Sequence, residues 1–215
     1  MKNLIKLLSL LQLTKEQPLT GYLIGGFKLS DIPTLAEHHY TSALSGYFLV
    51  QKIKEAGGKI NERKVILMLL IHDIPELFGG DISTPLNRKY PDLRTYKDKI
   101  GERAIELLTD YTHGKTRQEL LHLYEEMKEG TSDEALLVKI LDQMDHQLFL
   151  EHQNFKERFP NSQDYRPALF ADVIVKLTTH IRDPKTKIVV EEFLATFKEH
   201  FFNKGFQGMR FLMEE

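Results

Sequence analysis

The chain has 215 residues, carries 29 Lys and Arg against 31 Asp and Glu, and contains no cysteine. A near-neutral charge without a basic block argues against a dedicated binder of nucleic acid or of anionic membranes. The lack of cysteine excludes disulfides, thiolate zinc sites, iron–sulfur clusters and cysteine nucleophiles, so any metal must be bound by His, Asp or Glu.

Apolar residues recur at helical spacing along almost the whole chain, and strict alternation of apolar and polar residues is nearly absent. The sequence therefore predicts an all-α protein, and its length favours a single domain over residues 1–215. The predicted helices span residues 3–13, 34–56, 61–77, 91–112, 116–129, 132–157, 166–180 and 185–202.

The first predicted helix is rich in leucine, which raises the alternative of a signal peptide. Its apolar residues between Leu4 and Leu13 follow a broad helical stripe, and no small-residue cleavage site comes after them. The longest apolar run, Val65–Ile71, is far too short to span a bilayer. We therefore expect a cytoplasmic protein without a membrane partner.

The helix predicted at 61–77 carries the first signal of chemistry. Its apolar run should cross the core. The adjacent pair His72 and Asp73 follows directly after this run. Buried charge is costly without a partner, and a divalent cation is one such partner. A buried His–Asp hydrogen bond without metal is the alternative. Glu76 lies one turn beyond His72, and Pro75 should kink or end the helix there, which favours a site over simple packing.

Imidazole and carboxylate groups concentrate in four segments: AEHHY (36–40), HDIPE (72–76), GDISTP (80–85) and KILDQMD (139–145). In this order they resemble the HD-domain metal-dependent phosphohydrolases, and their neighbouring residues resemble the 5′-deoxynucleotidase branch of that family. The resemblance covers residues from about 18 to 150. It implies an HD-type helical bundle with this stretch as its metal-binding core and with additional C-terminal helices, at 160–215, that complete the bundle or form a dimer face.

The resemblance also implies a role for individual residues. One divalent metal ion (Co, Mn, Ni, Fe or Zn) would be bound by four side chains: His38, His72, Asp73 and Asp142. Glu76 matches the residue that transfers a proton, and Asp81 matches one that contacts sugar or water near the reacting phosphate. Thr84 has a positional role toward the substrate. The implied reaction hydrolyses a nucleoside or deoxynucleoside 5′-monophosphate to nucleoside and phosphate, and the implied assembly is a homodimer.

One departure from the branch concerns substrate binding. Its members carry strings such as PRTGW before the first His, whereas here the stretch is Pro18-Leu19-Thr20-Gly21-Tyr22, so leucine replaces an arginine that would bind phosphate. Three lysines are candidates for the missing cation, with a solvated surface position as the alternative for each: Lys28, Lys97 and Lys99.

Two other functions remain open on this sequence. The lost arginine is compatible with a different nucleotide phosphoester, such as an alarmone or a triphosphate. A catalytically silent protein that binds a nucleotide or a partner is the second alternative. Retention of all four candidate ligands together with Glu76 favours a metal-dependent enzyme with a small-molecule nucleotide as substrate.

Overall fold

The structure, a computed structural model, describes residues 1–80, 86, 89–155, 167–202, 206 and 208. Helices dominate these residues, and the β-type pairing found in them is an isolated antiparallel bridge between Pro18 and Thr34. The prediction of an all-α protein is confirmed. Within the same residues, no helix combines the length and the apolar character needed to cross a membrane.

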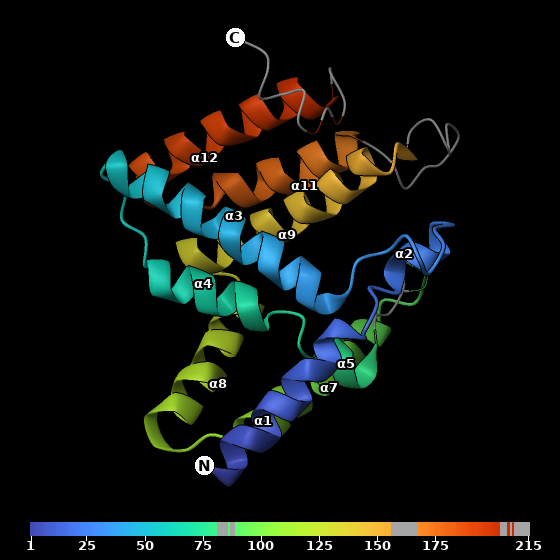
Figure 1. Cartoon of the computed structure of the whole chain (residues 1–215). Helices are drawn as coiled ribbons and strands as arrows, with labels where there is room; N and C mark the ends of the chain where they lie inside the picture. Colours follow the sequence, from blue (N-terminus) through green and yellow to red (C-terminus); the bar gives the residue numbers. More distant parts are fainter. Residues whose placement is uncertain (81–85, 87–88, 156–166, 203–205, 207, 209–215) are drawn as a thin grey trace. The chain divides into compact units, whose positions relative to one another are not determined.

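Figure 1 shows the helices along the chain, and their bounds follow in sequence order. They are α1 (Lys2–Gln12), the 3-10 helix η1 (Leu13–Lys15), α2 (Gly21–Ile24), α3 (Leu35–Glu55), α4 (Glu62–Ile71), α5 (Glu76–Gly79), α7 (Leu93–Thr109), α8 (Gly114–Glu129), α9 (Asp133–His152), α11 (Pro167–Thr179), α12 (Pro184–Phe197) and the π-helix η2 (Lys198–Phe202).

The main correction to the predicted elements concerns the helix expected at 61–77. It is wrong as one continuous helix, because α4 ends at Ile71, a turn covers residues 72–75, and α5 begins at Glu76. Pro75 explains the break, since proline has no N–H to donate and disfavours the helical conformation of the residue before it. The short helix α2 was not predicted. The predicted helix boundaries at residues 157 and 166 lie outside the described residues.

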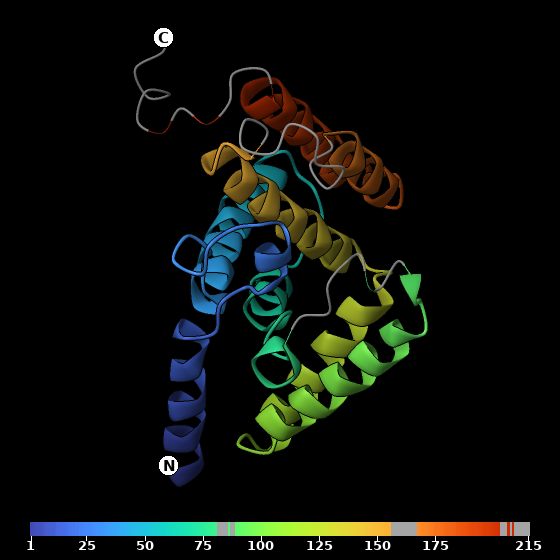
Figure 2. The same ribbon diagram turned by 90° about the vertical axis from the view of Figure 1, so that its right-hand side faces the viewer.

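The chain divides into two compact units, and the first contains residues Met1–Ala43 and Ile66–Gly130. In this unit α5 packs on α7, and α7 lies beside α8 (Figure 2). The close approach depends on Gly101 in α7, because a Cβ at that position would collide with the hydroxyl of Tyr124 in α8. α8 ends where Gly130 adopts a left-handed conformation with φ of 67°, a common helix C-terminus.

The second unit contains residues Leu44–Val65 and Thr131–Glu215. Here α11 packs against both α9 and α12 (Figure 1). Fully buried aliphatic side chains form the core of this unit, among them Ile53, Leu137, Ile140, Ile174 and Val190. The prediction that residues 1–215 form one domain stays a prediction.

Two aspartates join loops to helix starts in the second unit. The carboxylate oxygens of Asp133 accept hydrogen bonds from the backbone N–H groups of Arg182 and Asp183, each at 2.9 Å. Asp183 precedes α12, and its carboxylate accepts the N–H and hydroxyl of Thr186, both at 2.8 Å, and the N–H of Lys59 at 3.1 Å. These hydrogen bonds lower the pKa of Asp183, because they stabilise its charged form.

Candidate metal centre

The start of α3 fixes the first histidine of the site. Thr34 precedes the helix and accepts the backbone N–H of Glu37 at 3.3 Å, while the Glu37 carboxylate accepts the backbone N–H of Thr34 at 2.7 Å. This reciprocal pair is a capping box, which satisfies two N–H groups that a helix start would otherwise leave open. Glu37 therefore has a structural role at the start of α3, and His38 follows it at 3% exposure.

The end of α4 supplies the next two residues. Met68 and Leu69 are fully buried and Ile71 is 6% exposed, so the helix runs through the core as its sequence predicted. The turn that follows carries His72 and Asp73, whose side chains are 8% and 29% exposed. A buried helix that ends at this point delivers both groups to the edge of the core, where a solute can reach them.

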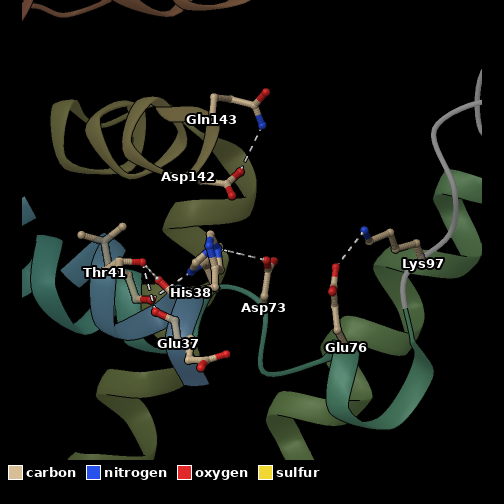
Figure 3. Close-up of polar contacts among 10 residues, drawn as sticks. Glu37, His38, Thr41, Asp73, Glu76, Lys97, Asp142 and Gln143 are labelled. Carbon is tan, nitrogen blue, oxygen red and sulfur yellow. Dashed lines mark hydrogen bonds and ion pairs between the residues drawn. The ribbon is translucent and has the colours of Figure 1, made fainter. Parts of the chain in front are cut away.

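Three donor atoms converge in the first unit. The Nε2 atoms of His38 and His72 lie 3.0 Å apart. An Asp73 carboxylate oxygen lies 3.7 Å from Nε2 of His38 and 3.4 Å from Nε2 of His72 (Figure 3). All three atoms belong to a group of potential metal-ligand atoms that lie within 4.8 Å of one another. Two residues from one turn and one from a helix 34 positions earlier thus meet at a single point.

A backbone contact sets the orientation of the His72 ring. Its Nδ1 lies 2.9 Å from the carbonyl oxygen of Leu69, which can only accept a hydrogen bond, so Nδ1 carries the hydrogen. In the neutral ring, Nε2 then presents its lone pair toward His38 and Asp73. Such a hydrogen bond on the nitrogen that faces away from the metal is typical of metal-binding histidines.

His39 is a further imidazole close to the site. Its ring is buried, with its centroid 5.9 Å from that of His38 and 5.1 Å from that of His72. The doublet of adjacent histidines in the sequence was the available signal for this third imidazole.

Glu76 is the first residue of α5, four residues after His72. Its side chain is 13% exposed, and its carboxylate lies 3.4 Å from the Nζ atom of Lys97 in α7 (Figure 3). Of the three lysines considered for substrate binding, Lys97 is the one with this contact, while Lys28 and Lys99 have exposed side chains. The carboxylates of Asp73 and Glu76 extend in the same direction from the segment that links α4 to α5 (Figure 3).

The remaining predicted site residues belong to other parts of the chain. Asp142 belongs to the second unit, where it lies in α9 and accepts a hydrogen bond from the side-chain amide of Gln143 at 3.2 Å (Figure 3). Asp81 and Thr84 lie outside the described residues. Leu19, at the position of the missing arginine, precedes α2, and its N–H donates to the carbonyl oxygen of Pro33 at 3.0 Å.

The converging donors fit a divalent transition metal. They comprise two imidazole nitrogens and one carboxylate oxygen without sulfur, a combination suited to first-row ions such as Mn, Fe, Co, Ni and Zn. The ring orientation of His72 already presents a lone pair for coordination. The geometry therefore supports a divalent metal site made by His38, His72 and Asp73.

Comparisons with known proteins show the family of this chain. The family model of the HD domain matches residues 30–174. The 5′-deoxynucleotidase HDDC2 of Dictyostelium discoideum is 29% identical over 147 residues, which cover 67% of this chain and 74% of that protein. The protein of the same name from Bos taurus is 28% identical over 165 residues, which cover 76% of this chain and 75% of that protein.

Solved structures share the fold. The PH0347 protein of Pyrococcus horikoshii OT3 superposes with a TM-score of 0.66 at 23% identity, covering 90% of this chain and 97% of that one. A conserved hypothetical protein from Pyrococcus furiosus superposes with a TM-score of 0.63 at 22% identity, covering 91% of this chain and 99% of that one. At these identities the likeness shows the fold alone.

Proposed function

The chain belongs to the HD-domain family, and from this premise we propose that it is a metal-dependent phosphohydrolase of nucleoside or deoxynucleoside 5′-monophosphates. The observation that carries the proposal is the convergence of His38, His72 and Asp73 on one point, with Glu76 three residues after Asp73. The names of the relatives add support for the substrate class, since several are 5′-deoxynucleotidases.

The proposed metal centre has four protein ligands and one ion. His38, His72 and Asp73 would hold the ion, and we propose Asp142 of α9 as the fourth ligand because its LVKILD segment resembles that of the 5′-deoxynucleotidases. When bound, a divalent ion supplies Lewis-acid chemistry, since it acidifies water and offsets negative charge on a phosphoryl oxygen. Co, Mn, Ni, Fe and Zn are all compatible with these ligands.

The proton steps are assigned to Glu76. Hydrolysis forms a bond from the water oxygen to phosphorus and breaks the bond from phosphorus to the 5′ oxygen. One proton must therefore leave the water and one must reach the leaving oxygen. The low exposure of Glu76 and its position three residues after Asp73 suit such a group. Asp81 is proposed to contact the sugar or water near the phosphate, and Thr84 to position the substrate.

A panel of substrates tests this function. The purified protein, loaded in turn with each candidate metal, should release inorganic phosphate from 5′-mononucleotides and 5′-deoxymononucleotides, and not from the 3′ isomers. Release only from a triphosphate or an alarmone would replace the proposed substrate with another phosphoester. No release with any metal would favour a nucleotide-binding or interaction module. A homodimer, suggested by the family resemblance, is part of the same proposal. So are a place in the cytoplasm and the lack of nucleic-acid and membrane partners, which the charge balance and the hydropathy of the chain favour.

A further inference from the structure

The contact between Glu76 and Lys97 is the feature of the first unit that the proposed proton transfer leaves unexplained. Glu76 opens α5, three residues after Asp73 of the donor cluster, whereas Lys97 comes from α7, 21 residues later. The close approach of α5 and α7 depends on a glycine, which has no side chain. A Cβ at Gly79, the last residue of α5, would lie 2.5 Å from Ile100 Cγ2. Gly101 allows the same α7 to lie close to α8.

The ion pair itself is too weak to account for this arrangement. Its Nζ–Oε1 distance of 3.4 Å is longer than that of a strong charged hydrogen bond, which is 2.7–2.9 Å. The lysine end of the pair is 42% exposed, so solvent screens the contact and reduces its contribution to folding stability. Lys97 can therefore exchange one anionic partner for another at small cost.

The exposure of the two partners differs in a way that suits an incoming anion. The Glu76 side chain is 13% exposed, whereas the Lys97 side chain is 42% exposed. A ligand that enters from solvent thus meets the ammonium group at the accessible end of the pair. A phosphate monoester carries a charge near −2 at neutral pH, so it attracts the ammonium more strongly than a single carboxylate does.

We propose that Lys97 binds the substrate phosphate, exchanging its contact with Glu76 for one with a phosphoryl oxygen. The inference rests on the proposed function and names the group that selects phosphate monoesters at this site. The exchange also moves the Lys97 ammonium away from the Glu76 carboxylate when the substrate is bound, so one movement couples phosphate recognition to a change around the proton-transfer group.

The test compares three variants of the metal-loaded protein. Lys97→Met removes the charge and keeps the length of the side chain, and Lys97→Arg keeps the charge. Lys128→Met is the matched control, because Lys128 is also an ion-paired lysine of the first unit, with contacts to Glu102 at 2.8 Å and to Glu125 at 3.1 Å. The readouts are kcat and KM for a deoxynucleoside 5′-monophosphate, and the affinity for inorganic phosphate by titration calorimetry.

The loss of a charge-assisted contact predicts that Lys97→Met raises KM and weakens phosphate binding by about tenfold or more. Lys97→Arg and Lys128→Met should stay near the wild type in both. A fall in kcat with unchanged KM and phosphate affinity would overturn the inference, because Lys97 would then act only by positioning Glu76. If the wild type hydrolyses no mononucleotide, the proposed function fails, while the phosphate titration still decides whether Lys97 binds this anion.

Discussion

A neutral imidazole binds a metal through one ring nitrogen only when the other nitrogen carries the hydrogen, and the contact from His72 Nδ1 to the Leu69 carbonyl meets this condition. The contact comes from the last turn of α4, so the same helix both delivers the ligand and sets its orientation. Asp73 follows on the next residue with a partly exposed carboxylate. The chemistry of the site therefore depends on the backbone at the point where α4 ends.

The proposed role of Glu76 leads to the first prediction about a single residue. Glu76→Gln keeps the size of the side chain and removes the group that accepts a proton, so turnover should fall by about 10²- to 10⁴-fold while the bound metal is unchanged. Phosphate release and metal analysis of the same samples measure both quantities. Glu102→Gln, at an ion pair with Lys128, is the control and should keep its activity. Retained turnover in Glu76→Gln would remove Glu76 from the mechanism.

The role of Asp142 gives a second prediction. If this carboxylate is the fourth ligand, Asp142→Ala should lower the metal content of the purified protein and its affinity for the ion, since one charged donor is lost. Elemental analysis and metal titration measure the change. Gln143→Ala alters the neighbouring residue of α9 and removes its hydrogen bond to Asp142, and it should keep most of the metal. Equal metal content in wild type and Asp142→Ala would contradict the assignment.

At the scale of elements, helix ends and close helix contacts decide which residues meet. Pro75 separates α4 from α5, and this break allows Glu76 to begin a new helix beside α7. Gly101 then lets α7 approach α8. In the second unit, the Asp183 carboxylate connects the start of α12 to the loop before α4, because it accepts the backbone N–H groups of Thr186 and Lys59.

The contact between Gly101 and Tyr124 can be tested by a double-mutant cycle. A Cβ at residue 101 would collide with the Tyr124 hydroxyl but would lie 3.4 Å from ring atom Cζ, an ordinary contact. Gly101→Ala should therefore destabilise the wild type by about 1–3 kcal/mol. In a Tyr124→Phe background the same change should be neutral or stabilising by up to about 1 kcal/mol, because alanine favours helices over glycine. Equal destabilisation in both backgrounds, measured by denaturant unfolding, would show that the collision is elsewhere.

The Asp183 carboxylate predicts a pH dependence of stability. Its pKa is lower in the folded protein than in the unfolded chain, chiefly through the hydrogen bonds from Thr186. The contribution is therefore complete above the unfolded pKa of about 4 and is lost as the pH falls through the lower folded value. Asp183→Asn should lower the thermal midpoint at pH 7, and the difference from wild type should shrink below pH 4.

The control for this experiment is another aspartate at a helix start. Asp92 precedes α7 but makes no side-chain hydrogen bond to cap that helix. Asp92→Asn should therefore change the thermal midpoint little at either pH. A gap between Asp183→Asn and wild type that stays constant from pH 7 to pH 3 would contradict the proposed role of the Asp183 charge.

At the scale of the whole molecule, metal binding should appear as folding stability. A ligand held only by the native state stabilises it by about 2.7 kcal/mol when present at 100 times its Kd. Removing the ion with a chelator should therefore lower the thermal midpoint and abolish phosphate release. In His38→Ala the chelator should have a much smaller effect on the midpoint. An equal shift in that variant, measured by scanning calorimetry, would place the stabilising ion at other residues.

The sequence by itself determined the elements of this protein and the residue types available for chemistry. Helical periodicity predicted nearly all the long helices, and the lack of cysteine limited the ligands to His, Asp and Glu. Both are local properties, because a helix follows from neighbours three and four residues apart. The HD-domain resemblance named the candidate ligands, although their metal-binding roles stay predictions.

Only the tertiary structure decided which of these residues meet. It brought His38 to His72 and Asp73, buried His39 beside them, and selected Lys97 from three lysines as the partner of Glu76. The periodicity of the sequence does not contain this information, because it depends on how helices far apart in the chain pack. It also depends on positions such as Gly79 and Gly101, where the absence of a side chain lets helices approach.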